Sequence, residues 1–255
     1  MSVTHSPAAP EINLVEVSDL RESLAAGWRD FRRAPLLGAL FSAVYVLGGW
    51  LIFWAMTTKG QVWWTLPASA GFPILGPFIA CGFYEISRRL EAGEPLVASQ
   101  IFGVIFRQKD RQIPAMAAVI VVYFLFWNFL SHMIFALFLG NAVMTNVSSS
   151  LAVFLSPQGL AMLAFGTLVG AAFATLLFSL TVVSLPMLLD REVDFVTAML
   201  TSFALVRESP GIMLGWGLLI ATCLFVGMLP GFLGLFLVLP LFGHASWHLY
   251  RHAIT

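Results

Sequence analysis

Long apolar segments separated by short polar ones dominate the pattern of the chain. They cover residues 35–58, 62–87, 113–140, 159–189, 211–228 and 231–250. A helix needs about 20 apolar residues to cross the hydrocarbon core of a bilayer. The pattern therefore predicts an all-α polytopic membrane protein with six transmembrane helices. The short connections at 57–61 and at Pro230-Gly231 indicate hairpin turns, and we expect the six helices to form three hairpins.

A less apolar segment with helical periodicity precedes the first, third and fifth spans. Each resembles an amphipathic helix that lies in the membrane interface. A shift of 175 positions places Asp19 on Asp194 and aligns two copies of the pattern Arg-x-x-Pro, which begin at Arg32 and Arg207. This order predicts a parallel repeat with a pseudo-threefold axis along the membrane normal. The alternative is that any bundle of hairpins with interfacial helices looks periodic.

Almost all the charged side chains fall on one side of the predicted membrane. Every Asp and Glu, and every Lys and Arg except Lys59, lies in segments that six crossings place on the same side as the N-terminus. Lys and Arg near the ends of spans are retained on the cytoplasmic face. The sequence therefore predicts that both termini are cytoplasmic.

The composition agrees with a membrane protein. Hydrophobic residues make up 59% and charged residues 10% of the 255 residues, and the mean hydropathy is +0.90. Soluble proteins carry about a quarter charged residues. The net charge is zero, so we expect no nucleic-acid partner. Residues 1–12 are polar and predict a disordered cytoplasmic tail, with a single membrane domain over 13–255.

Small and aromatic residues predict how the helices pack. Gly166, Gly170 and Ala174 recur at four-residue spacing in the fourth span, which favours close approach of a neighbouring helix and predicts that this helix is central. Trp247 and Tyr250 near an inner span end indicate an aromatic belt at the interface.

Ionisable groups at membrane depth are the best candidates for a functional site, because they are costly in lipid. The sequence offers a polar cluster at the cytoplasmic mouth of the bundle, which would bind an ion, a proton or an anionic head group. Its members are Glu85, Arg88, Asp190, His244, His248 and Arg251. The alternative is that charged groups at helix ends simply extend to the interface.

No complete metal or catalytic site is present in the sequence. His244, His248 and His252 share one helix face, the geometry that two imidazoles need to bind one metal, but no further ligand is fixed beside them. Acid, base and nucleophile are not assembled at any spacing. We therefore expect no metal, no cofactor, no catalytic residues and no enzymatic activity.

Several motifs resemble a bacterial family of predicted integral membrane proteins known as domain of unknown function 2189 (DUF2189). The matching stretches are Gly27-Trp28-Arg29-Asp30 with Arg33 and Pro35; Gly76-Pro77, Tyr84-Glu85, Ser87 to Glu91 and Gly93-Glu94; Ser184 to Met187 with Asp190; and Pro240, Gly243-His244, Trp247-His248 and Tyr250-Arg251. They are spread over nearly the whole chain. The resemblance implies a multi-span protein of the bacterial inner membrane with no assigned activity or cofactor.

These observations favour an accessory or scaffold subunit of a membrane complex, because so few buried charges leave little machinery for coupled transport. The partners expected are membrane lipids and either another membrane protein or further copies of this chain. A transporter or channel for a small solute, ion or lipid remains the alternative, and a membrane-embedded enzyme is the third class.

Overall fold

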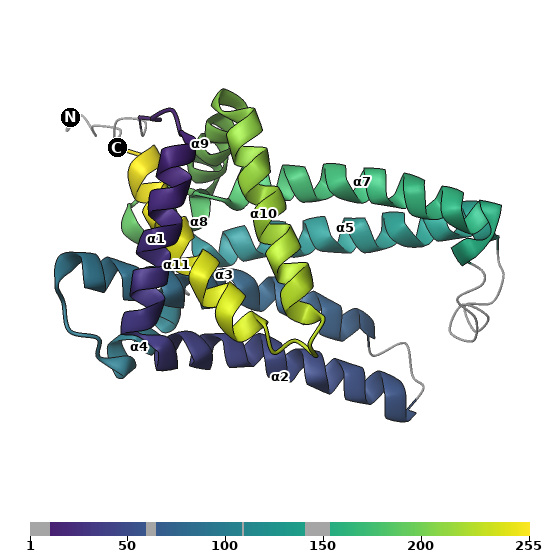
Figure 1. Cartoon of the computed structure of the whole chain (residues 1–255), viewed down its shortest axis with the longest axis horizontal. Helices are drawn as coiled ribbons and strands as arrows, with labels where there is room; N and C mark the ends of the chain where they lie inside the picture. The colour runs from purple at the N-terminus through teal and green to yellow at the C-terminus, as the bar shows by residue number, and fades with distance from the viewer. Residues whose placement is uncertain (1–10, 60–64, 109, 141–153) are drawn as a thin grey trace, which may run out of the picture.

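The computed structural model describes residues 11–59, 65–108, 110–140 and 154–255. In these residues the chain is helical and forms no strand beyond one isolated bridge, so the all-α prediction is confirmed. The helices, in chain order, are α1 (Val17–Arg33), α2 (Pro35–Lys59), α3 (Thr65–Ala92), α4 (Ala98–Gln108), α5 (Ile113–Leu139), α7 (Pro157–Thr181), α8 (Ser184–Asp190), α9 (Phe195–Glu208), α10 (Pro210–Met228) and α11 (Leu235–Ala253) (Figure 1).

Four stretches of the described chain are long and apolar enough to cross a membrane. They are Pro35–Trp54, Ile113–Leu139, Pro157–Asp190 and Pro210–Met228. Only 17–28% of the apolar window in each is buried inside the protein. A water-soluble fold buries such residues, whereas lipid solvates them, so these outward-facing apolar surfaces are those of a membrane protein.

The helices α3 and α11 fall outside this group of four, although the sequence predicts spans at 62–87 and 231–250. Helix α3 continues to Ala92 and α11 to Ala253, and both have polar C-terminal ends. The histidines in the C-terminal half of α11 lower its apolarity, whereas the charged side chains of α3 begin only at Glu85. The six-span topology therefore stays a prediction.

The predicted span 159–189 is not one continuous helix. It is interrupted at Val182 and Val183, between α7 and α8. Pro186 explains the break, because a proline cannot donate to the carbonyl four residues earlier and its ring crowds that carbonyl. The amide of Val183 donates instead to the hydroxyl of Ser202 on α9, over 3.3 Å.

Helices α3 and α11 form the centre of the bundle, and α1 lies along α11 (Figure 1). The prediction that the fourth span is central is wrong. Helix α7 packs mainly on α5 and α9, and the α5–α7 pair extends away from the other helices. A central helix must bury most of its circumference, whereas α7 buries only Gly159, Met162 and Ser179.

The inner aromatic belt is also wrong for Trp247 and Tyr250. Their exposed fractions are 1% and 0%, and they belong to the largest buried side chains of the bundle. Both have polar partners inside the protein, which an aromatic at the lipid interface would not need. These side chains are therefore part of the core at the charged end.

The polar N-terminal segment joins the fold earlier than predicted. Ile12 forms an antiparallel bridge with Ile254, and the Glu11 amide donates to the Thr255 carbonyl over 3.2 Å. Glu11 and Ile12, which the prediction assigned to the tail, therefore belong to the fold, because they satisfy backbone groups beyond α11. Residues 1–10 lie outside the described residues.

The contact between α1 and α11 depends on Gly27. A Cβ atom at this position would lie 2.7 Å from the Ala245 backbone nitrogen and 2.9 Å from the Leu241 carbonyl oxygen. Backbone atoms cannot move aside as a flexible side chain does. Gly27 therefore sets the distance at which the two helices meet.

We expect Gly27→Ala to separate α1 from α11 and to destabilise the purified protein by about 1–3 kcal/mol. That loss corresponds to roughly 3–10 °C in the thermal midpoint, measured in detergent. The matched control is Gly215→Ala in α10, where an added Cβ meets nothing within 4 Å. Equal midpoints for the two variants would contradict the close contact.

Candidate functional site

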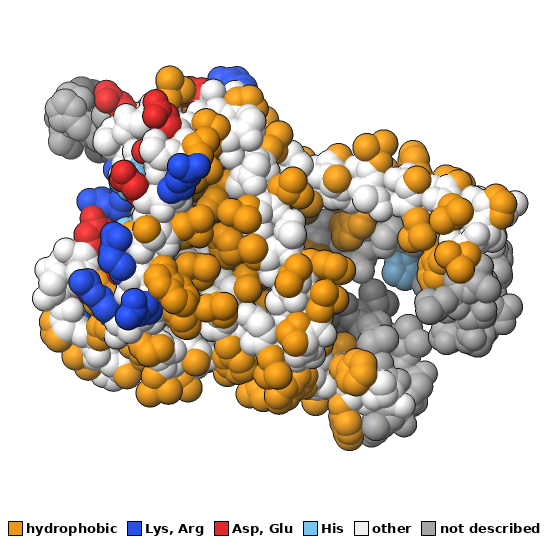
Figure 2. Space-filling view, in the orientation of Figure 1, with side chains coloured by type: hydrophobic (Ala, Val, Ile, Leu, Met, Phe, Trp, Pro, Cys, Tyr) orange, Lys and Arg blue, Asp and Glu red, His pale blue; other side chains and the backbone are white. Residues whose placement is uncertain are grey.

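Charged side chains gather at one end of the molecule, around α1 and α4 (Figure 2). The rest of the surface in this view is largely apolar. The six predicted site residues come from the C-terminal ends of α3, α8 and α11. The polar end of the bundle thus contains the candidate site residues.

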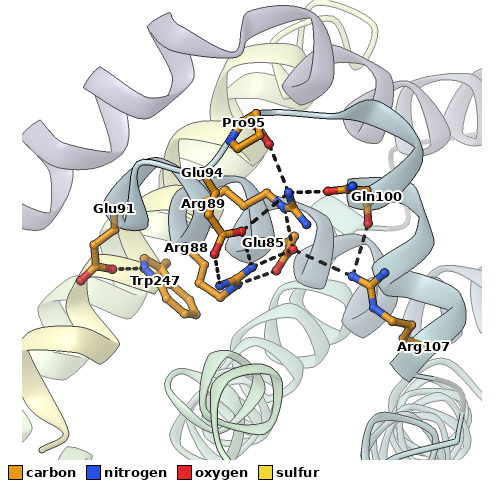
Figure 3. A network of polar contacts seen from close by, with 9 residues as sticks. All are labelled: Glu85, Arg88, Arg89, Glu91, Glu94, Pro95, Gln100, Arg107 and Trp247. Atoms are coloured by element: carbon orange, nitrogen blue, oxygen red, sulfur yellow. Dashed lines mark hydrogen bonds and ion pairs between the residues drawn. The ribbon is translucent and has the colours of Figure 1, made fainter.

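The buried carboxylate of Glu85 is the centre of the largest polar network (Figure 3). The side chain is 3% exposed. Arg88 donates to both of its oxygens, over 2.8 Å and 3.1 Å, and Arg89 donates to Oε1 over 2.7 Å. Residues three and four positions apart lie on one helix face, so the spacing within α3 alone brings these three groups together.

The same arginines attach α4 to α3. Arg88 also donates to both oxygens of Glu94, each over 3.2 Å. Arg89 donates to the Pro95 carbonyl and to the Gln100 side chain, over 3.1 Å and 2.8 Å. Hydrogen bonding to Glu85 raises the pKa of Arg88 above its usual value. The network therefore fixes the α3–α4 connection.

A second polar group joins α8 to α11. The Tyr250 hydroxyl donates to Asp190 over 2.7 Å and accepts from Arg191 Nε over 2.9 Å. Arg251 lies 3.6 Å from the same Asp190 carboxylate. Arg191 also donates to the carbonyls of residues 254 and 255. These bonds hold the C-terminal end of α11 against the end of α8.

Glu91 connects α3 to α11. It accepts from Trp247 Nε1 over 2.9 Å and from Arg251 Nε over 3.1 Å. Arg251 therefore has carboxylate partners on two helices, Glu91 on α3 and Asp190 on α8. The contact explains why the large Trp247 ring can be buried with its polar nitrogen satisfied.

The two predicted histidines have different partners. His248 Nε2 lies 2.7 Å from Asp30 Oδ2 on α1, and both side chains are largely buried. His244 is fully buried, with Nδ1 2.9 Å from the Ser87 hydroxyl on α3. No described residue bonds to His244 Nε2. The two histidines thus join α11 to α1 and to α3.

The structure brings the six predicted residues together in part. Glu85 pairs with Arg88, and Asp190 with Arg251, but none of the contacts described above joins these two pairs or links them to the histidines. The residues that complete the contacts were not predicted as site residues. They are Asp30, Ser87, Arg89, Glu91, Glu94, Gln100, Arg191, Trp247 and Tyr250.

Spacing along α3 was a usable signal for Arg89, which follows Glu85 by one helical turn. Asp30 gave no such signal, because 218 positions separate it from His248. Such a pair is visible only once α1 and α11 are known to pack together.

The histidine stripe of α11 does not converge on one point. His248 contacts Asp30, His244 contacts Ser87, and His252 is exposed. Among the described residues no three His, Cys, Asp or Glu side chains are grouped as metal ligands. The thiols of Cys81 and Cys223 are free.

The arrangement suits holding helices together better than binding a charged substrate. Within the described chain the carboxylates of Glu85, Glu91 and Asp190 are each bonded to arginine, tyrosine or tryptophan. Breaking a buried ion pair costs about 3–5 kcal/mol, so these carboxylates are not freely available to a ligand.

We expect Glu85→Gln to destabilise the protein by about 3 kcal/mol, because it removes the 2.7 Å ion pair of the nearly buried Arg89 and leaves Glu94, at 3.7 Å, as its nearest carboxylate. The thermal midpoint in detergent measures the effect. The matched control is Glu192→Gln. The Glu192 side chain is 96% exposed and its ion pair with Arg111 is long, at 4.0 Å, so this substitution should change the thermal midpoint little. If the two variants unfold at the same temperature, the network is not the support described here.

Comparisons with known proteins bear on this region. Residues 65–190 match the family model described as "Predicted integral membrane protein (DUF2189)". The match includes the motifs around Glu85 and Asp190, whereas those at 27–35 and 240–251 lie outside it. No curated protein and no solved structure matches the chain. The resemblance is thus confirmed from α3 to α8, and over this part the chain is similar to the DUF2189 family of predicted integral membrane proteins.

Proposed function

We propose that this chain is an accessory subunit of a complex in the bacterial inner membrane, and that it holds a transmembrane helix of another protein against α5 and α7. It crosses the membrane six times, through α2, α3, α5, α7–α8, α10 and α11. Both termini are cytoplasmic. The observation that carries the proposal is an open groove between α5 and α7.

The pairing of charges supports α3 and α11 as the two further spans. Glu85 and Glu94 together balance the charges of Arg88 and Arg89 at the end of α3, so the helix does not carry isolated charges into the interface. The charged groups lie at one end (Figure 2), as the retention of Lys and Arg in the cytoplasm requires.

The order of the helices supports three repeated units. A short helix followed by two longer ones occurs three times, beginning at α1, α4 and α9. Ala34 and Ser209, which end α1 and α9, have similar backbone angles, with φ/ψ of −133°/49° and −126°/57°. Each precedes a proline, which disfavours continuation of the helix at that residue.

The groove has the properties of a helix-binding surface in lipid. Its volume is about 580 Å³. Gly166, Gly170 and Ala174 line its α7 side, and Trp127 and Ser131 its α5 side. Lipid supplies no hydrophobic drive for helix association, so small residues that allow close packing and polar groups that bond across helices have to supply it.

The groove is open at Gly166. A Cβ atom there would find only Ile134, at 3.9 Å, whereas at Gly170 it would lie 3.1 Å from the Trp127 ring. The first position faces space that the described residues leave unfilled, and the second is already used for packing against α5. We therefore assign the Gly166 end of the groove to the partner helix.

The bonding at the charged end supports a role in binding rather than in chemistry. Glu85, Glu91 and Asp190 are already bonded to neighbouring side chains. A general acid or base has to reach a substrate within hydrogen-bonding distance. Accordingly, no enzymatic activity is proposed.

The topology predicts which positions a membrane-impermeant thiol reagent can reach. In a variant without Cys81 and Cys223, Leu229→Cys in the α10–α11 turn should react in intact spheroplasts. Glu192→Cys should react only after the membrane is opened. Both side chains are exposed in the structure, so the protein itself shields neither position from the reagent. Labelling of Glu192→Cys in intact spheroplasts would exclude the proposed orientation.

The docking groove can be tested by photo-crosslinking in the native membrane. A photoreactive residue at Thr167, which lines the groove, should give one discrete protein adduct. The same residue at Leu168, which is 70% exposed and outside the groove lining, should give lipid adducts. Gly166→Leu fills the groove and should reduce the Thr167 adduct by at least about tenfold, equivalent to about 1.4 kcal/mol.

The size of the adduct separates the outcomes. An adduct with a different membrane protein supports the accessory role, whereas one with the mass of two copies of this chain replaces that role by a homo-oligomer. Equal lipid adducts at Thr167 and Leu168 would leave the groove without a protein partner and refute the proposal.

A further inference from the structure

The arginines at the charged end fall into two groups. Arg88, Arg89, Arg107, Arg111 and Arg251 lie within 4.0 Å of a carboxylate, and Arg191 bonds to a tyrosine and two carbonyls. Among the described residues, the others form no ion pair with Asp or Glu. They are Arg21, Arg29, Arg32 and Arg33 on α1, and Arg207 on α9.

Three of these unpaired arginines lie close together at the C-terminal end of α1. Arg29, Arg32 and Arg33 are exposed, and the adjacent Arg32 and Arg33 follow Arg29 by about one helical turn. Asp30, the acidic residue between them, is buried against α11 and bonded to His248. Within the described residues its partner is His248 and it forms no ion pair with these arginines, so this part of the helix presents positive charge that no described carboxylate neutralises.

An apolar edge borders the arginines. Trp28 is 43% exposed, although its ring lies 5.5 Å from that of Phe31. One residue after α1 the chain enters α2, where Leu36 is 72% exposed at the beginning of a candidate span. A tryptophan beside the end of a span is typical of the level of the lipid head groups.

We infer that Trp28, Arg29, Arg32 and Arg33, together with Leu36, bind an anionic phospholipid. The arginines hold the phosphate, because the planar guanidinium presents paired N–H donors that match its oxygens. Trp28 lies at the boundary between head group and acyl chain, and Leu36 contacts the chain. The inference rests on the proposed membrane orientation only for the leaflet, which would be the cytoplasmic one.

The apolar edge favours lipid over an acidic protein or a free phosphate. A soluble anion needs only the three guanidinium groups and would leave Trp28 and Leu36 in water. A phospholipid covers both parts at once, and α2 begins at the depth where its acyl chain would run. Basic residues near an anionic membrane surface each strengthen binding by a modest amount, so three together give a clear preference.

Purified full-length protein in nanodiscs tests the inference, because both leaflets are present and the orientation in cells does not matter. Replacing part of the phosphatidylcholine by phosphatidylglycerol should raise the thermal midpoint, and native mass spectrometry should show retained phosphatidylglycerol. The variant Arg29→Gln, Arg32→Gln, Arg33→Gln should reduce this retention by at least about tenfold. Trp28→Ala should reduce it less.

A matched control removes the same amount of charge elsewhere on the charged end. The variant Arg21→Gln, Arg111→Gln, Arg207→Gln should keep the preference for phosphatidylglycerol. Equal loss of phosphatidylglycerol retention in both triple variants would show that only overall charge matters and would overturn the site. The absence of any preference for phosphatidylglycerol in the unmodified protein would also overturn it. An equal rise in the midpoint with glycerol phosphate in phosphatidylcholine discs would show a free-phosphate site instead.

Discussion

The carboxylate of Glu85 is the group on which the charged end depends. It is 3% exposed and bonded to two arginines on its own helix. A lone buried carboxylate would have to be neutralised or hydrated, whereas a paired one can remain ionised inside the protein. The pairing allows α3 to run from an apolar segment directly into a polar one, and through Arg89 it fixes the position of α4.

Helix α11 is held in place by close backbone contact with α1, whereas the polar end of α3 is stabilised by ion pairs. Gly27 lets α1 approach α11 until atoms of their backbones are nearly in contact. At that distance Asp30 reaches His248 over 2.7 Å. The contact between Asp30 and His248 therefore depends on Gly27, which lies three residues before Asp30 and has no side chain. The two features together stabilise the packing of α1 against α11.

These two cases show why one part of the site was predictable and another was not. Glu85, Arg88 and Arg89 lie within one turn, so helical periodicity alone places them together. The break before α8 also follows from local chemistry, since Pro186 cannot continue the hydrogen bonding of α7. The Asp30–His248 contact joins opposite ends of the chain. Local periodicity holds no information on such a pair. It holds none either on the burial of the Trp247 side chain of α11 beside α3.

The α5–α7 arm and the end of α1 would bind their ligands through different forces. Association along Gly166 takes place in lipid, where van der Waals packing and polar contacts have to drive it, so it depends on shape and hardly on salt. Binding at Arg29, Arg32 and Arg33 is electrostatic and is screened by salt. The two surfaces share no described contact, and distant sites without shared partners tend to act additively. On the two proposals, one chain would hold a partner helix and an anionic lipid at separate surfaces, one sensitive to shape and the other to salt.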